Sequence, residues 1–281
     1  MTTTAPTAIA VPDAPGSVLS RVRWTAADAW TLTLRGINHW IRQPFTILAG
    51  WAFMIMLVAL YGLLFGGAIN VPGGGSYMEF LLPGMFVMTM AFGIGETMSA
   101  IAVDAERGVT DRFRSMPMAS SAVVLGRSIT DMIYSVTGLA VMLGAGLVLG
   151  WRWHGTLGET LAAFGLLLLL RFAMLWIGIF LGLLVPGPSA VNSVWTLLFP
   201  LTMVTAAFAP PETMPAWLGF IAEWNPLTAT IYATRDLFGN PGVASGSFVA
   251  DNALMLAVAW PILIVAVFLP LSVHRYRNLS R

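Results

Sequence analysis

Few side chains in this sequence have the types and spacing that catalysis or metal binding needs. The chain has no cysteine, which excludes disulfides, thiolate metal sites and a cysteine nucleophile. Its three histidines, His39, His154 and His274, are far apart and flank apolar runs. The sequence contains neither a glycine-rich Walker A loop nor an H-E-x-x-H motif. We therefore expect no catalytic residues, no metal site and no bound cofactor on this chain.

Two charged residues lie inside long apolar runs, where charge is expensive. Glu96 and Arg171 each stand among apolar neighbours, and a lone charge within a bilayer costs at least about 2.5–3.5 kcal/mol. Each should therefore face protein or a wet cavity. One hypothesis is that the two attract each other, although a rise of about 1.5 Å per residue puts their levels roughly 10 Å apart. The alternative is that Arg171 meets a partner subunit, a substrate headgroup or a lipid phosphate.

A compact charged segment, DAERGVTDRFRSMPMASSAVVLGR, occupies residues 104–127. It contains three acids and four arginines, and Pro117 interrupts it. A loop that only connects two helices can be a few residues long. One interpretation is a rigid knob that presses into a partner protein, and the other is an arginine-rich loop that only sets membrane topology.

The composition requires that helices in a membrane position these residues. Of the 281 residues, 57% are hydrophobic and 10% are charged, against about 25% charged in soluble domains. Because each span needs about 20 apolar residues, we predict an all-α, polytopic membrane protein with a six-span domain over 44–274. The predicted spans cover residues 46–66, 80–103, 129–150, 159–185, 190–209 and 251–272.

The arginines predict the orientation of these spans. With the N-terminus in the cytoplasm, eleven arginines lie in inner segments, two (Arg152 and Arg235) in outer segments, and Arg171 within the fourth span. Inner loops of membrane proteins carry the excess of positive charge. Both termini should therefore be cytoplasmic, with residues 1–21 a disordered tail and 275–281 a short one.

Two further segments have helical patterns of their own. Residues 22–43 form an apolar stripe at helical spacing, ended by Pro44, which predicts an amphipathic helix on the inner membrane face. It serves either as a surface anchor or as a dock for a cytosolic partner. In the outer segment 210–250, Pro215 and Pro226 should each start a short helix, and Gly239 should end the second. Both short helices are expected to dip into the outer leaflet.

These parts together resemble a known family. The run Glu106-Arg107-Gly108, then Asp111-Arg112-Phe113-Arg114 and Pro117, is similar to the loop after the second span in type-2 ABC exporter permeases. The resemblance is strongest to the daunorubicin/doxorubicin-resistance permeases of actinobacteria. The P-x-W segment with Asn225-Pro226 and Arg235 resembles that family's outer segment. The Val109-Thr110 pair departs from the family pattern, and the similarity covers about residues 20–275.

The resemblance implies a membrane-spanning permease subunit in a bacterial plasma membrane. Two permeases would pair, as a homodimer or a heterodimer, and each would dock a separate ABC ATPase chain that binds ATP and Mg. The coupling loop would present Glu106, Arg107, Gly108, Asp111, Arg112, Arg114 and Pro117 to that ATPase, and the connecting helix would carry Trp30, Arg35 and Arg42. The substrate would be an amphipathic drug, lipid or glycolipid, with membrane lipid but no nucleic acid among the partners.

Helical spacing also indicates a possible substrate path. One face of the second span and one of the fifth combine methionines and aromatics, which make adaptable apolar surfaces. These residues are Met85, Met88, Phe92 and Glu96 on the second span, and Asn192, Trp195, Phe199 and Met203 on the fifth. Packing or lipid contact explains the same pattern. A secondary transporter driven by protons or sodium is the alternative function, although such proteins usually show several intramembrane acids and internal repeats.

Overall fold

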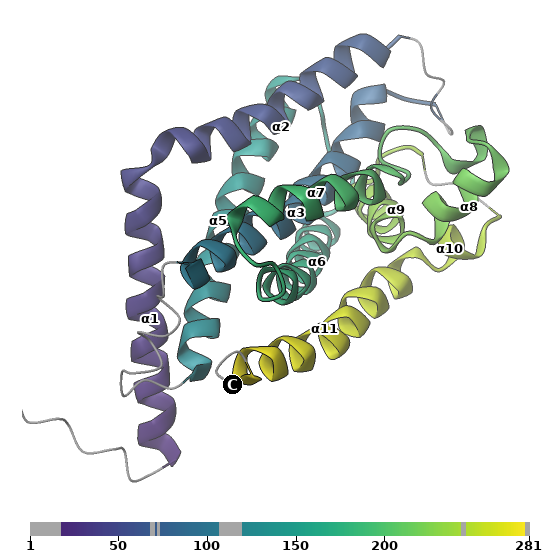
Figure 1. Ribbon diagram of the computed structural model, residues 1–281. Coiled ribbons are helices and arrows are strands. Elements are labelled where there is room, and N and C mark those ends of the chain that lie inside the picture. The colour runs from purple at the N-terminus through teal and green to yellow at the C-terminus, as the bar shows by residue number, and fades with distance from the viewer. Residues whose placement is uncertain (1–17, 68–70, 72–73, 107–119, 243–245, 279–281) are drawn as a thin grey trace, which may run out of the picture.

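The regular structure of this chain is helical throughout the part that the computed structural model describes, residues 18–67, 71, 74–106, 120–242 and 246–278. Five helices in this part are long and apolar enough to cross a membrane, which confirms the predicted polytopic all-α class. The helices, shown in Figure 1, are α1 (Val18–Arg42), α2 (Pro44–Phe65), α3 (Tyr77–Glu106), α5 (Ser120–Val148), α6 (Leu157–Gly182), α7 (Pro188–Met203), α8 (Ala216–Trp224), α9 (Pro226–Phe238), α10 (Phe248–Asp251) and α11 (Ala253–Asn278).

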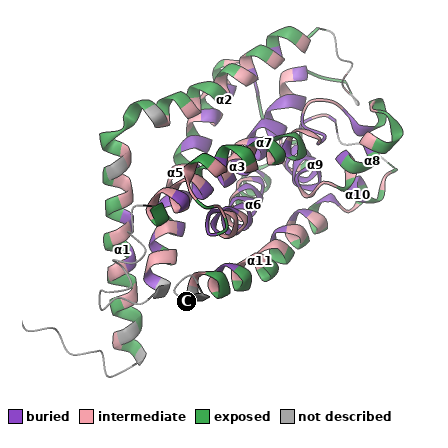
Figure 2. Cartoon of the chain, in the orientation of Figure 1, coloured by how far each residue is buried: buried purple, intermediate pink, exposed green. Residues whose placement is uncertain are grey.

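Helices α3 and α6 form the centre of the bundle. More than half of each is buried against neighbouring helices, whereas α2 and α11 bury much less of their apolar surface. Figure 2 shows this contrast, with exposed residues along α1, α2 and α11 and mostly buried residues on α6 and α9. Exposed apolar side chains on a helix of this length are what lipid contact requires, so α2 and α11 present lipid-compatible surfaces.

Helix α1 turns sharply away from α2 and runs across one end of the bundle (Figure 1). The break occurs at Gln43, because Pro44 disfavours helical backbone at the preceding residue and starts a new helix itself. Small residues hold α1 against α5: the Thr33 hydroxyl donates to the carbonyl of Gly126, 3.2 Å away. The predicted apolar stripe, including Trp30, Leu34 and Ile41, is exposed on another face. That face is free to lie on a membrane.

The fifth predicted span is shorter than the sequence pattern indicates. Residues 190–209 were expected to cross the membrane, but α7 ends at Met203 after 16 residues. At about 1.5 Å per residue, such a helix covers roughly 24 Å, less than the hydrocarbon core of about 30 Å. Helix α7 is therefore not among the five span-length helices of the described chain, and the count of six spans stays a prediction.

The short helices α8, α9 and α10 gather at the end of the bundle opposite α1 (Figure 1). Their limits follow local sequence signals, as predicted. Pro215 precedes α8, and the Asn225 side chain caps α9 by accepting from the backbone N–H of Leu227 at 3.0 Å. Helix α9 ends at Gly239, whose φ of 65° is the left-handed conformation that glycine adopts easily. Their depth in a membrane stays a prediction.

The charged segment 104–127 is partly helical. Helix α3 continues to Glu106 and α5 begins at Ser120, nine residues before the predicted start of the third span. Residues 107–119 lie outside the described residues, as do residues 1–17 of the predicted N-terminal tail.

Candidate functional site

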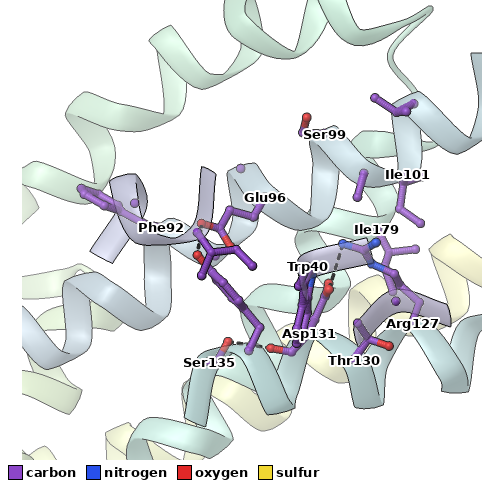
Figure 3. Close-up of a pocket in the computed structure, with 18 of the residues that line it drawn as sticks. Trp40, Phe92, Glu96, Ser99, Ile101, Arg127, Thr130, Asp131, Ser135 and Ile179 are labelled. Carbon is purple, nitrogen blue, oxygen red and sulfur yellow. Dashed lines mark hydrogen bonds and ion pairs between the residues drawn. The ribbon is translucent and has the colours of Figure 1, made fainter. Parts of the chain in front are cut away.

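A cavity of about 780 Å³ lies between α1, α2, α3, α5 and α7, with smaller contributions from α6 and α11. Its volume falls in the range of small-molecule sites, roughly 300–1,000 Å³. Figure 3 shows part of its lining, with labelled side chains from several helices around one space. The cavity is therefore built by residues far apart in the sequence.

Most of the cavity wall lies toward one end of the bundle. The wall uses α1, the first half of α2, the first two thirds of α5, most of α7, α3 from Thr89 onward, and the last turns of α6 and α11. This is the end that α1 crosses and at which α3 and α5 approach the charged segment. It is also the end to which the arginine distribution assigns the cytoplasm, so the predicted orientation makes this an inward-side cavity.

Glu96 presents its carboxylate to the cavity from α3, as Figure 3 shows. Its Oε1 accepts a hydrogen bond from the Tyr134 hydroxyl of α5 at 3.0 Å. The Tyr134 ring lies 5.3 Å from the Trp40 ring and 6.0 Å from the Trp51 ring, centroid to centroid. The acid is therefore held beside an aromatic group contributed by α1, α2 and α5.

A second aromatic group stands one turn earlier on α3. Phe92 meets Trp195 of α7 edge to face at 5.6 Å and lies 5.8 Å from Phe199. All three rings line the cavity. Offset and edge-to-face ring contacts give rigid apolar surfaces, so this part of the wall is shaped to take an apolar group.

An ion network forms part of the polar wall and extends behind it. Asp131 of α5 forms an ion pair with Arg127 at 2.8 Å and accepts a hydrogen bond from the Thr97 hydroxyl at 2.6 Å. Arg171 of α6 places its Nη2 atom 3.9 Å from the Oδ2 atom of Asp131. The same Nη2 donates to the Thr97 hydroxyl at 3.0 Å, and Nε donates to the Ser135 hydroxyl at 2.6 Å. The network joins α3, α5 and α6, and it satisfies most of the polar atoms that burial removes from water.

The direct Glu96–Arg171 pair proposed from the sequence is not found among the described residues. Arg171 has 1% of its surface exposed and reaches Asp131, whereas Glu96 bonds to Tyr134. The physical reason is that Glu96 and Arg171 lie at different levels along their helices. Asp131 on α5 is closer to the Arg171 guanidinium than Glu96 on α3 is. Gly93 makes this possible, because a Cβ there would lie 2.5 Å from the guanidinium carbon of Arg171.

The structure divides the residues of the predicted substrate path into two sets. Phe92, Glu96, Asn192, Trp195 and Phe199 line the cavity. Met85 and Met88 are instead fully buried in the hydrophobic core, and Met203 packs against the same core. The predicted face of α3 is continuous, but only its later half borders the cavity.

The predicted contacts to an ATPase fall mostly outside the described residues. Glu106 is exposed at the end of α3, while Arg107, Gly108, Asp111, Arg112, Arg114 and Pro117 lie in the range that is not described. On α1, Trp30 and Arg42 are exposed, and Arg35 borders the cavity. Their proposed roles stay predictions.

A buried arginine at the opposite end has a role that sequence patterns missed. Arg235, counted as an outer-loop charge, is fully buried with its guanidinium 3.7 Å from the centre of the Phe80 ring. It donates to the backbone carbonyls of Phe80 at 3.0 Å, Ala206 at 2.8 Å, Ala207 at 3.3 Å and Gly242 at 3.3 Å. Arg235 thus ties α9 to the start of α3 and to the chain after α7. No sequence pattern signals this role: Asp236 follows Arg235 directly but is exposed, and the hydrogen-bond acceptors of Arg235 are backbone carbonyls from distant parts of the chain.

Comparison with known proteins shows the family of this chain. The model of the ABC-2 type transporter family matches residues 27–238. A daunorubicin resistance ABC transporter permease protein of Streptomyces coeruleorubidus, DrrB1, is 32% identical over 80% of this chain and 77% of its own. A probable doxorubicin resistance permease of Mycobacterium tuberculosis, DrrC, is 23% identical over 95% and 94%. A putative transport permease of Cyanophora paradoxa, ycf38, is 27% identical over 71% and 70%. The chain, a multi-pass membrane protein, therefore belongs to the ABC-2 type transporter family.

Proposed function

We propose that this chain is the membrane-spanning subunit of an ATP-driven exporter that moves amphipathic molecules, such as a drug, a lipid or a glycolipid, out of the cell. The observation that carries the proposal is the cavity at the α1 end of the bundle. With the termini in the cytoplasm, a substrate would enter this cavity from the cytoplasm or the inner leaflet. An exporter must collect its substrate from that side.

The cavity wall fits an amphipathic substrate. Phe92, Trp195 and Phe199 supply an apolar surface, while Glu96 and the Arg127–Asp131 pair supply polar groups at the same space. Ligand sites typically combine mostly apolar walls with a few polar groups that fix orientation. The relatives named as daunorubicin and doxorubicin resistance permeases support the same substrate class.

The energy would come from a partner chain, as membership of this family implies. No Walker A loop is present in the sequence, so ATP and Mg would bind to a separate ABC ATPase subunit. We propose that the segment around Glu106 and Arg112 contacts this ATPase, while α1, packed on α5, transmits its movement to the cavity wall. A second permease subunit, identical or related, would complete the transporter.

The test is ATP-driven export by the complete complex. Inside-out vesicles with the permease and its co-expressed ATPase should accumulate at least one member of a panel of fluorescent amphiphiles, comprising a cation, a neutral alcohol and a short-chain phospholipid. Accumulation should require ATP and should survive an ionophore that collapses the proton gradient. Uptake that follows the proton gradient and ignores ATP would instead establish a secondary transporter.

Coupling is tested by changing the charged segment. Glu106→Ala or Arg112→Ala should leave the chain inserted but weaken co-purification of the ATPase or uncouple ATP hydrolysis from export. Charge-assisted contacts at such an interface contribute about 1.5–3 kcal/mol each. Normal export together with normal ATPase capture in both variants would remove this segment from the mechanism.

Orientation is tested with single cysteines, since the chain has none of its own. An impermeant thiol reagent should label Ser76→Cys from outside intact cells and should label Ser115→Cys only after permeabilisation. The reverse pattern would place the cavity on the outer side and overturn the proposed direction of transport.

A further inference from the structure

Glu96 differs from Asp131, another acid at the cavity, in having an open carboxylate. Asp131 is 4% exposed and already holds Arg127 and Thr97, with Arg171 on its other side. Among the described residues, Glu96 forms no ion pair, and its one side-chain hydrogen bond comes from the Tyr134 hydroxyl to Oε1. Its second carboxylate oxygen therefore remains available to a molecule in the cavity.

The surroundings of Glu96 favour a positive partner. Tyr134, in contact with Trp40 and Trp51, stands on one side, and Phe92 with Trp195 lies one turn away on the other. The faces of aromatic rings attract cations, and the attraction grows when water is removed. An acid surrounded by aromatic rings is the arrangement by which proteins recognise an ammonium group attached to an apolar body.

Arg35 also borders the cavity, and the arginines of the buried network are directed at an acid other than Glu96. Arg127 and Arg171 are both directed at Asp131, at 2.8 and 3.9 Å, and Arg171 is buried behind the wall instead of lining it. Glu96 and Gly50 both line the cavity of about 780 Å³. There is therefore space for a ligand group next to the carboxylate.

We infer that Glu96 and the rings around it form a subsite for the cationic amine of an amphipathic substrate, whose apolar body lies against Phe92, Trp195 and Phe199. The inference rests on the proposed export function and names its substrate class, cationic amphiphiles with a flat or aromatic body. The amine donates to the open oxygen of Glu96, and Tyr134 keeps the carboxylate in place.

The test uses three matched fluorescent probes that differ only in the polar group: pyrenebutylamine, pyrenebutanol and pyrenebutyrate. Their binding is measured with the purified permease in nanodiscs. The wild-type protein should bind the amine about tenfold more tightly than the alcohol, a difference of about 1.4 kcal/mol, and bind the carboxylate most weakly. In Glu96→Gln the affinity for the amine should fall to that of the alcohol, while the alcohol's own affinity is unchanged.

One control variant and one variant of a positioning residue separate this role from a structural one. Glu79→Gln removes an acid from the outer end of the same helix, where Glu79 bonds to His154, and should keep the amine preference. Tyr134→Phe removes the hydrogen bond that holds the Glu96 carboxylate but keeps the ring, and should reduce the amine preference without abolishing it. Melting temperatures in detergent establish that each variant is folded.

The outcomes separate the subsite from the exporter. Three results would overturn the subsite: equal binding of amine and alcohol by the wild type, an unchanged amine preference in Glu96→Gln, or no binding of any probe. In each case, ATP-driven export of the amphiphile panel would still support the exporter. Glu96-dependent amine binding without any ATP-driven export would keep the subsite and overturn the exporter. Uptake driven by a proton gradient and lost in Glu96→Gln would assign Glu96 to proton coupling, against the subsite.

Discussion

The Arg171 network depends on the absence of a side chain at Gly93, and Gly93→Ala tests this directly. An alanine Cβ at this position would lie 2.5 Å from both Cζ and Nη1 of Arg171 and 2.8 Å from Nε. Non-bonded heavy atoms pack at about 3.5–4.0 Å, so the guanidinium would have to move by about 1 Å. Such a shift would stretch its bonds to Ser135 and Thr97, now 2.6 and 3.0 Å long.

The cost of this substitution follows from two effects. Overpacking a close-packed interior costs about 1–3 kcal/mol. If the guanidinium also leaves Asp131, the loss approaches the roughly 3–5 kcal/mol that breaking a buried ion pair costs. A substitution that raises the free energy of the folded state by about 1.4 kcal/mol, without affecting the transition state for unfolding, speeds unfolding about tenfold. We therefore expect Gly93→Ala to unfold about five- to a hundredfold faster than the wild type.

The assay is the rate of thermal inactivation in detergent, followed by loss of the monodisperse peak in size-exclusion chromatography. Gly165→Ala is the matched control, because Gly165 is also helical and a Cβ there would meet nothing within 4 Å. Alanine is a better helix former than glycine, so this variant should be as stable as the wild type or slightly more stable. Any difference between the two variants then reports the contact with Arg171.

The Arg171→Leu variant provides a second background in which to measure the cost of Gly93→Ala. In Arg171→Leu the shorter side chain no longer reaches Gly93, so adding Gly93→Ala should cost little more. Equal inactivation rates of Gly93→Ala and Gly165→Ala would show that the guanidinium does not occupy this space. An equal cost of Gly93→Ala with and without Arg171 would place the crowding elsewhere.

Two further predictions concern the buried arginines. Arg235→Met removes a cation that donates to four backbone carbonyls, and each such bond contributes about 1.5–3 kcal/mol. The Arg235→Met protein should therefore lose its native fold much faster on heating than the Arg152→Met protein, because Arg152 is exposed. Equal inactivation rates would contradict the role of Arg235 in joining α9 to the start of α3. A double-mutant cycle of Asp131→Asn with Arg171→Leu should show a coupling free energy of about 0.5–3 kcal/mol in stability. This coupling should exceed that of Glu96→Gln with Arg171→Leu, because Asp131 is the acid that Arg171 reaches. The opposite order would mean that Arg171 pairs with Glu96 in the membrane.

Short-range sequence signals account for most of the helix limits. Pro44 ends α1 and begins α2, Asn225 and Pro226 begin α9, and Gly239 ends it. These signals act within a few residues through fixed φ angles and local capping bonds. The high content of apolar residues likewise indicated a membrane protein, in which helices or closed barrels satisfy the backbone hydrogen bonds. The continuous apolar runs of about 20 residues are typical of membrane-spanning helices.

The extent of α7 shows where apolar pattern stops being sufficient. The residues after Met203 remain apolar, yet the backbone N–H of Ala206 turns to the Thr228 hydroxyl and two carbonyls of this stretch accept from Arg235. These partners come from α9, so the end of α7 depends on a helix that follows it by more than twenty residues.

The sequence by itself showed that Glu96 and Arg171 must face protein or a wet cavity, because an isolated charge in lipid is too costly. Tertiary structure alone decided that Arg171 reaches Asp131 and that Glu96 keeps an open oxygen at the cavity. Helical periodicity assigns residues to a face but does not say which neighbouring helix covers which part of it. Met85 and Glu96 share a face of α3, yet one is buried in the core and the other lines the cavity, since different helices pack against the two halves of α3.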